Sequence, residues 1–233
     1  ICVVYRRINQ DYDYSGREEI EMIAAAIQHC GREIVLSLSP GPAHIDRAWD
    51  YCKNANMWRI TDDFWDTWEL LVPMFWRCEL WQDHVKEGCY PDCDMLPFGK
   101  LGKGFGEERD TRLTKDEQKT VMTLWTFFRS PLMVGAELTK LDDWTLSMLQ
   151  NKGLIDRMKA TCHGEQVCRN DEMAVWKNTD SADGSICVAL FNLTEEEKEI
   201  SVALDEVEDG LADCGLTELW DQTKSQTAGG SII

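Results

Sequence analysis

The chain has 233 residues, 43% of them hydrophobic and 28% charged, and its formal net charge is -18. This composition is typical of a folded globular protein. The acidic excess repels phosphate backbones, which argues against a nucleic-acid partner and favours a neutral substrate, and no apolar run approaches the roughly 20 residues that a membrane helix needs.

The first predicted elements alternate between helix and strand. Residues 17–30 are predicted to form a helix because Ile20, Ile23 and Ile27 fall on one face and Gly31 follows. A continuous apolar run then predicts a buried strand over 34–39, ended by Pro40-Gly-Pro42. We further predict a helix over 44–54, a strand over 57–61 and a helix over 64–81, in which Pro73 is expected to cause a kink or a break.

The alternation continues to about residue 158. A strand end is predicted at 92–96, and Thr114-Lys-Asp-Glu117 is a capping box that opens a helix over 118–129. A short strand over 132–135 and a helix near 142–150 complete this part. Repeated strand, loop and helix predict an α/β fold with a parallel sheet, in which the functional residues directly follow the strands.

From about residue 159 the pattern becomes one of strands divided by acidic or glycine-bearing turns. Strands are predicted over 174–177, 186–193, 199–203 and 216–220 with no helical period between them. This region is therefore predicted to be a small antiparallel β domain, a sandwich. The glycine-rich segment 99–106 lacks the spacing of a phosphate-binding loop and is predicted to be a mobile loop.

The ten cysteines are scattered, and the one close pair, Cys89 and Cys93, does not have the usual zinc spacing. We expect mostly reduced thiols and no metal or other cofactor. A cytoplasmic location is favoured, while a secreted or periplasmic one with some disulfides stays open, as does a homo-oligomer. The chain begins Ile1-Cys-Val-Val4, without an initiator Met or a signal peptide, so we expect a piece of a longer protein.

Two acidic clusters about thirty residues apart, at 56–68 and 91–99, are the most informative feature. Each begins as a strand-like run and ends in carboxylates beside aromatic rings. Such a pairing suits a pocket that holds a sugar, because a ring stacks on its apolar face while carboxylates bind hydroxyls and act as acid, base or nucleophile. The alternative is a pair of solvated acidic loops.

Five segments carry a resemblance to a known family: 36–42, 56–63, 92–99, Thr114-x-x-Glu-Gln118 and Ser130-Pro-Leu-Met-Val-Gly135. In order and spacing they resemble the bacterial α-galactosidases (melibiases) of glycoside hydrolase family 27, over 17 to about 158. The resemblance implies a (β/α)8 barrel followed by a β-sandwich, with residues 1–158 forming about strands four to eight of the barrel and 159–233 a truncated sandwich.

The resemblance also implies roles for individual residues in a retaining mechanism. Asp63 matches the acid/base, four residues after the Trp-Arg pair, and Arg59 matches the arginine that holds the substrate. Asp92 and Asp94 match the pair near the pocket floor. Two more positions are implied: Ser39, which reads the substituent at sugar C2, and Trp58, which lies beside the pocket.

The first residues depart from the family. A gapless backward alignment places the family's nucleophile strand on 3–9, so that its Lys becomes Arg7 and its nucleophilic Asp becomes Asn9. An amide carries no negative charge and is a very poor nucleophile toward an acetal carbon.

The acid/base role requires Asp63 to hold a proton near neutral pH. Burial against Trp58 and Trp65 would raise its pKa, and Arg59 would lower it. The alternative is that Asp63 caps a helix that starts at Phe64.

Three functions stay open. The first is a fragment of an α-galactosidase, which cleaves terminal α-linked galactose from oligosaccharides or galactosides. The second is a catalytically silent sugar-binding homologue or inactive fragment, because of Asn9. The third is a glycosyltransferase, since Asp92-Cys-Asp94 has the Asp-x-Asp form that binds a metal and a nucleotide sugar.

Overall fold

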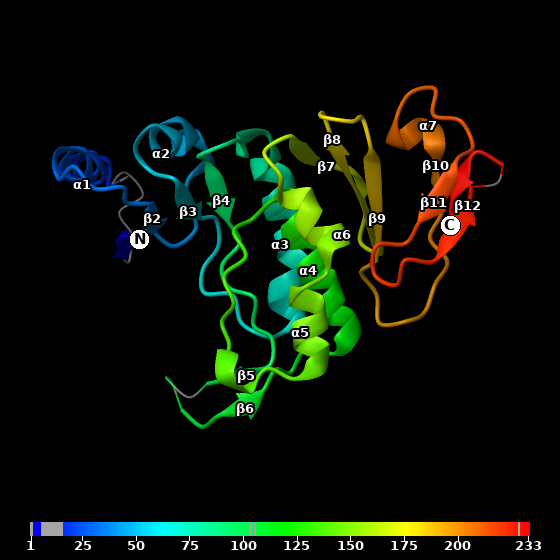
Figure 1. Cartoon of the computed structure of the whole chain (residues 1–233), viewed down its shortest axis with the longest axis horizontal. Coiled ribbons are helices and arrows are strands. Elements are labelled where there is room, and N and C mark those ends of the chain that lie inside the picture. The colour runs from blue at the N-terminus through cyan, green and yellow to red at the C-terminus, as the bar shows by residue number, and fades with distance from the viewer. Residues whose placement is uncertain (1, 6–15, 103, 105, 228) are drawn as a thin grey trace. The chain divides into compact units, whose positions relative to one another are not determined.

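The computed structural model describes residues 2–5, 16–102, 104, 106–227 and 229–233 (Figure 1). The chain divides into two compact units, each built from two stretches of sequence. The first unit is Ile1–Pro97 with Ser130–Gly135, and the second is Phe98–Arg129 with Ala136–Ile233. Each unit is described by itself, and the domain boundary predicted at residue 158 stays a prediction.

The first unit contains a four-stranded parallel sheet in the order β1 (Cys2–Tyr5), β2 (Leu36–Ser39), β3 (Met57–Arg59) and β4 (Tyr90–Asp92). Helices α1 (Arg17–His29), α2 (Ala48–Asn54) and α3 (Trp68–Trp81) connect successive strands. Single 3-10 turns over Ile45–Arg47 and Gln82–His84 lead into α2 and follow α3. The predicted alternation of strand and helix is therefore confirmed here.

Helix α3 corrects the prediction made for Pro73. The helix begins at Trp68, four residues later than expected, and continues through Pro73 to Trp81. Because Pro73 lies within the first two turns, its missing N–H leaves only the carbonyl of the exposed Glu69 without its usual helical donor. One such loss early in a helix does not end it, so the break is wrong, while the alternative of a kink at Pro73 stays a prediction.

The segment 130–135 returns to the first unit as a single parallel bridge between Leu96 and Val134. The backbone N–H of Leu96 donates to the carbonyl of Met133 at 2.8 Å, and the N–H of Gly135 donates to the carbonyl of Leu96 at 3.0 Å. The strand predicted over 132–135 is thus reduced to this one bridge.

The second unit begins with a short hairpin and a buried helix. Strands β5 (Lys100–Leu101) and β6 (Arg109–Asp110) pair antiparallel, so the glycine-rich segment contains part of a hairpin that the sequence did not predict. Helix α4 (Lys115–Phe128) opens with the predicted capping box between Thr114 and Glu117. Helices α5 (Asp143–Leu149) and α6 (Lys152–Ile155) follow, with 3-10 turns at Leu138–Lys140 and Asp156–Met158.

The rest of the second unit is built from antiparallel strands. Strands β7 (Cys162–Arg169), β8 (Met173–Asp180) and β9 (Ile186–Asn192) form one sheet. Strand β10 (Val202–Ala203) pairs with β13 (Ser231–Ile232), and β11 (Gly215–Thr217) pairs with β12 (Lys224–Gln226). The predicted antiparallel character is confirmed, but β7 was missed, and a one-turn helix, α7 (Leu204–Val207), lies where no helix was expected.

The central strand β8 packs on both of its faces. Val175 forms a buried cluster with Val202 and Val207 on one face. On the other face the ring of Trp176 meets Phe128 edge-on, with ring centroids 6.3 Å apart. Alternating side chains of a strand point to opposite faces, so β8 joins the end of α4 to the strands that follow.

The carbonyl of Phe127, near the end of α4, makes a close contact with the sheet. The Nδ2 of Asn178 donates to this oxygen at 3.1 Å. A Cβ atom at position 164 of β7 would overlap the same oxygen, so this close approach requires Gly164. The backbone of β7 at Gly164 lies so close to the end of α4 that no side chain fits at this position.

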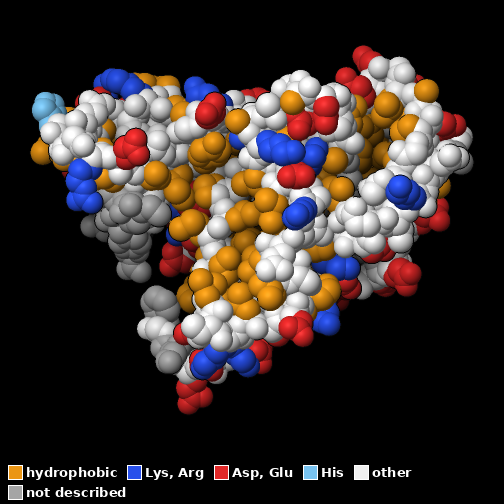
Figure 2. Space-filling model, in the orientation of Figure 1, with side chains coloured by type: hydrophobic (Ala, Val, Ile, Leu, Met, Phe, Trp, Pro, Cys, Tyr) orange, Lys and Arg blue, Asp and Glu red, His pale blue; other side chains and the backbone are white. Residues whose placement is uncertain are grey.

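The surface carries no single charged face in the view of Figure 2, where acidic and basic side chains are interspersed. Large apolar side chains are also exposed, among them Trp49 and Trp76, each 50% accessible. Within the described residues, no helix combines the length and the apolar character needed to cross a bilayer.

Candidate active site

The ends of the parallel strands carry a row of polar residues. Arg59 pairs with Asp92 in the register of β3 and β4, and Ser39 follows Leu38, which pairs with Trp58. Because paired residues of parallel strands direct their side chains to the same face, Ser39, Arg59 and Asp92 share one face of the sheet. Ser39 is 8% exposed and Asp92 is 5% exposed.

Arg59 holds two carboxylates at this edge. Its Nη1 lies 3.0 Å from Oδ1 of Asp94, and its Nη2 lies 3.2 Å from Oδ1 of Asp63. The side chains of Arg59 and Asp94 are 12% and 18% exposed, whereas that of Asp63 is 69% exposed. The pair with Asp94 is therefore the better shielded from water.

The loops after β3 and β4 are joined by hydrogen bonds to two of these carboxylates. Asp94 has a left-handed backbone with φ of 75°, and its N–H donates to Oδ1 of Asp92 at 2.9 Å. Its Oδ2 accepts the N–H of Phe64 at 2.7 Å. The N–H of Ile60 donates to the carbonyl of Asp92 at 2.9 Å. Asp94 thereby fixes both loops around Arg59.

Burial changes the acidity of this pair of aspartates. Burial raises the pKa of Asp92 to about 6, against the hydrogen bond from the Asp94 N–H and the charge of Arg59, which act to lower it. Burial also raises the pKa of Asp94, although the N–H of Phe64 and the charge of Arg59 oppose the change. The pKa of Asp92, at about 6, therefore lies above that of an ordinary aspartate.

Asp63 differs from its expected surroundings. The helix after it begins at Trp68 with Thr67 preceding it, so Asp63 does not cap α3, and the N–H of Phe64 goes to Asp94 instead. The expected burial of the Asp63 side chain against Trp58 and Trp65 is wrong, since that side chain is mostly exposed.

Trp58 lies on the opposite face of β3 from Arg59. Its ring is fully buried, 5.7 Å from the ring of Tyr51 and 6.1 Å from that of Trp81, measured between centroids. The Trp58 ring therefore packs in the core on the far face of β3 and offers no surface on which a sugar ring could stack.

Arg7 and Asn9 lie outside the described residues. The strand that precedes them, β1, pairs in parallel with β2, with Tyr5 opposite Ser39 in the register.

Two buried groups near the row were not predicted. The N–H of Cys93, between the two aspartates, donates to Oγ of Ser130 at 2.9 Å, and Ser130 is fully buried. The Sγ of Cys93 lies 3.6 Å from that of Cys78 on α3, and burial raises the pKa of the Cys93 thiol well above its usual range. Ser130 opens the segment Ser130–Gly135 that carries the family resemblance, but no role was predicted for its hydroxyl.

The arrangement offers a guanidinium donor, the buried carboxylate of Asp92, the half-buried carboxylate of Asp94 and a hydroxyl on one edge of a sheet. These groups suit a ligand with several hydroxyls held in fixed directions. Among the described residues, no three His, Cys, Asp or Glu side chains converge as they would around a metal ion.

The chain is similar to alpha-galactosidases in both a family model and curated relatives. The family model described as alpha galactosidase A (Melibiase_2) matches residues 8–159. Alpha-galactosidase 2 of Arabidopsis thaliana is 25% identical over 212 residues, which cover 90% of this chain and 50% of that protein. This chain therefore spans about half the length of the curated relatives it matches.

Solved structures of bacterial proteins are more similar. A glycoside hydrolase family 27 β-L-arabinopyranosidase from Geobacillus stearothermophilus is 43% identical, with a TM-score of 0.92, over 99% of this chain and 53% of that one. A protein described as a putative α-N-acetylgalactosaminidase from Bacillus halodurans is 41% identical, with a TM-score of 0.80, over 99% of this chain and 54% of that one.

Proposed function

Because the chain belongs to the alpha galactosidase A family of glycoside hydrolase family 27, we propose that its first unit carries one side of a glycosidase pocket. The chain would then be a partial (β/α)8 barrel followed by a β-sandwich. The parallel order of β1 to β4, with helices between them, and the antiparallel strands after residue 161 support this assignment. In barrel enzymes the active site lies at the carboxyl ends of the strands.

The observation that carries the proposal is the position of Ser39, Arg59 and Asp92 at those carboxyl ends, with Asp94 beside Arg59. Arg59 already pairs with Asp63 and Asp94, and Asp92 accepts the Asp94 N–H, so a sugar's hydroxyls would take the donor and acceptor positions that these groups have left. Arg59 would donate to one hydroxyl while Asp92 accepts from another. Asp94 would orient Arg59 and Ser39 would face the C2 substituent.

We propose a retaining reaction for the complete site. Such a reaction needs two carboxyl groups about 5–5.5 Å apart, one that attacks the anomeric carbon and one that protonates the leaving oxygen. Asp63, on the exposed loop beside Arg59, is the proposed acid/base. Asn9 stands at the proposed nucleophile position, so the chain as given should bind a sugar without forming a glycosyl-enzyme. A silent sugar-binding role is thus the second candidate.

The sugar is proposed to be a pyranose with the hydroxyl pattern of galactose. The relatives are named for α-galactosides, a β-L-arabinopyranoside and an α-N-acetylgalactosaminide. A β-L-arabinopyranosyl ring matches an α-galactosyl ring without the C6 hydroxymethyl group, and the N-acetyl sugar differs at C2. One set of side chains could therefore hold the shared hydroxyls of all three.

The first experiment is a nuclear magnetic resonance titration of the 233-residue chain with galactose, L-arabinose and N-acetylgalactosamine. We expect shifts at the Arg59 guanidinium and loss of binding in Arg59→Gln, while Arg47→Gln, at an exposed arginine, binds normally. Equal binding by both variants would refute the proposed site.

The second experiment separates hydrolysis from binding. The unmodified chain should not hydrolyse an aryl α-galactoside or aryl β-L-arabinopyranoside above background. Asn9→Asp, with the preceding barrel strands supplied from a related enzyme, should restore a retaining activity. In that background Asp63→Asn should slow substrates with poor leaving groups most, since those depend on proton donation. Equal losses on good and poor leaving groups would remove Asp63 from the acid/base role.

A further inference from the structure

The hydroxyl of Ser130 contacts the backbone between the two aspartates of the candidate site. Its Oγ accepts the N–H of Cys93 at 2.9 Å, although the two residues lie 37 positions apart in the sequence. Ser130 is fully buried, and its own hydroxyl proton is directed to the carbonyl of Pro131, 3.4 Å away. A lone pair of the hydroxyl oxygen therefore faces the N–H of Cys93.

The segment that carries Ser130 is held against the loop after β4 at two further points. The N–H of Leu96 donates to the carbonyl of Met133 at 2.8 Å, and the N–H of Gly135 donates to the carbonyl of Leu96 at 3.0 Å. A Cβ atom at position 135 would overlap the side chain of Met95, so the close approach of the segment requires glycine there. The position of the Ser130 hydroxyl is thus fixed by the backbone contacts of its own segment.

The turn that Ser130 contacts has an unusual backbone. Asp94 is left-handed, with φ of 75°, which is unfavourable for a residue with a Cβ atom and persists only where the surrounding contacts fix it. One such contact is the bond from the Asp94 N–H to Asp92, and another is the bond from the Cys93 N–H to Ser130. Together they fix the peptide groups before and after Cys93.

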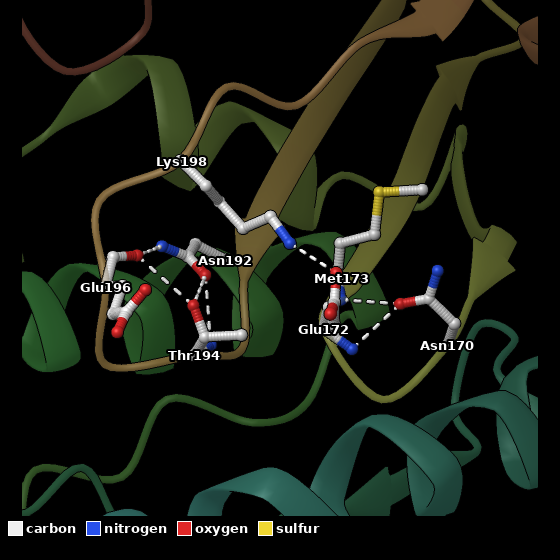
Figure 3. Close-up of polar contacts among 7 residues, drawn as sticks. All are labelled: Asn170, Glu172, Met173, Asn192, Thr194, Glu196 and Lys198. Atoms are coloured by element: carbon white, nitrogen blue, oxygen red, sulfur yellow. Dashed lines mark hydrogen bonds and ion pairs between the residues drawn. The ribbon is translucent and has the colours of Figure 1, made fainter.

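Comparable turns elsewhere in the chain are closed by residues that lie close by in the sequence. In the turn between β7 and β8, Oδ1 of Asn170 accepts the N–H of Glu172 at 2.8 Å (Figure 3). In the loop after β9, Oδ1 of Asn192 accepts the N–H of Thr194 at 2.9 Å. The turn that begins at Asp92 differs from both, because the hydroxyl that completes it comes from a distant segment.

The conformation of the turn sets the direction of the two groups that are proposed to meet the sugar. Asp94 lies 3.0 Å from Nη1 of Arg59 and accepts the N–H of Phe64 at 2.7 Å. If the turn relaxed, Arg59 would lose the better shielded of its two carboxylates. Asp92 would at the same time lose the N–H that its carboxylate accepts.

We propose that Ser130 is a positioning residue, whose hydroxyl holds the turn over 92–94 in the conformation that presents Arg59 and Asp92 to the sugar. This role rests on the proposed function, since it assumes that a sugar binds at this edge of the sheet. Ser130 acts through the peptide group before Cys93 and not by contact with the sugar. Without its hydroxyl the buried N–H of Cys93 would lack this acceptor, which favours a rearrangement of the turn.

The first test compares Ser130→Ala with Thr126→Ala, because each change removes a fully buried hydroxyl. A carbon-13 magnetic resonance titration of the aspartate side chains measures the pKa of Asp92, which burial raises to about 6. The charges of Asp94 and Arg59 act on this carboxyl in opposite directions, so the Asp94 N–H decides the sign of the change. Its loss in Ser130→Ala should raise the pKa further, by at least about 0.5. Thr126→Ala should leave the pKa unchanged, and equal values in the two variants would overturn the positioning role.

A second measurement needs no variant. Hydrogen exchange of the unmodified chain should show a strongly protected amide at Cys93, since this N–H donates to a buried hydroxyl. Exchange as fast as that of an exposed amide would reject the hydrogen bond on which the role of Ser130 depends.

Sugar affinity separates this inference from the proposed function. In a titration with galactose, L-arabinose and N-acetylgalactosamine, Ser130→Ala should weaken binding at least about fivefold, and Thr126→Ala should change it by less than about twofold. Normal affinity and a normal pKa of Asp92 in Ser130→Ala would overturn the positioning role alone. No binding by the unmodified chain would overturn the proposed function and, with it, the presentation of Arg59 and Asp92 to a sugar.

Discussion

The guanidinium of Arg59 lies 3.0 Å from the carboxylate of Asp94, although Arg59 ends β3 and Asp94 follows β4. This contact and the bond from the Phe64 N–H to Asp94 hold together two loops that the sequence separates widely. The sequence led us to expect the charge of Arg59 to act on Asp63, but its contact with the better buried Asp94 was not predicted.

We expect Arg59→Met to destabilise the fold by about 2–3 kcal/mol at pH 7.5, because it leaves the buried carboxylate of Asp92 and the half-buried carboxylate of Asp94 without the neighbouring cation. The loss should be smaller at pH 5, because burial raises the pKa of Asp92 to about 6 and this carboxyl then takes up a proton. Urea unfolding at the two pH values measures this difference. An equal loss at both would contradict the electrostatic explanation, and Arg47→Met is the exposed control.

Asp92→Asn should make the protein more stable at pH 7.5. The folded-state pKa of Asp92 is raised from 3.8 to about 6, so the stability it contributes is fully present below pH 3.8 and is lost as the pH rises through about 6. An asparagine removes this loss and still accepts the Asp94 N–H, which predicts a gain of up to about 3 kcal/mol.

The same substitution should abolish sugar binding if Asp92 accepts a hydroxyl. Unfolding measured from pH 4 to 8 should show a fall for the natural chain that is absent in Asp92→Asn. A variant that is less stable than the natural chain at pH 7.5 would show that the charged form of Asp92 contributes to folding.

Gly164→Ala should cost at least about 3 kcal/mol, since the added methyl group meets the carbonyl oxygen of Phe127 on rigid backbone. Gly184→Ala is the control: its φ is +73° but no atom lies within 4 Å of the added group, so only about 1 kcal/mol of backbone strain is expected. Similar losses for the two alanine variants in thermal unfolding would mean that the helix end moves aside.

Cys78 and Cys93 should form a disulfide when the protein is treated with diamide, because their sulfur atoms are already 3.6 Å apart. The reaction should quicken as the pH rises, since burial raises the pKa of the Cys93 thiol. Mass spectrometry of a variant with Cys30→Ser and Cys214→Ser, which removes two exposed thiols, would identify the linked peptides. A linkage to any other cysteine would contradict this geometry.

The sequence was most informative where the determining interactions are local. The capping box at Thr114 and Glu117 and the apolar stripe of Ile20, Ile23 and Ile27 depend on neighbours within one turn, and both helices formed as predicted. Strand β7 was missed because Cys162-His-Gly-Glu-Gln-Val has no apolar alternation. Its pairing depends on β8 and on the approach of α4, neither of which the segment itself encodes.

In the candidate site, too, the features that depend on local sequence were predicted and those that depend on distant packing were not. The strand end at Ser39 was placed correctly because a continuous apolar run locates β2, whereas β3 ends at Arg59 and not at 61, and β4 ends at Asp92, where the predicted strand end over 92–96 begins. The exposure of Asp63 and the burial of the Trp58 ring depend on how the loop and the helices pack around β3. Such packing involves residues far apart in the chain, so the spacing of residues along the sequence does not predict which side chains it buries.

The meeting of Phe127 and Gly164 has a consequence for how this chain can be recombined with its relatives. A gene crossover at residue 159 would join α4 from one parent to β7 and β8 from another. If the second parent had any residue larger than glycine at position 164, its side chain would collide with the α4 end even when each parental half folds well. Position 164 and the end of α4 must therefore be inherited together.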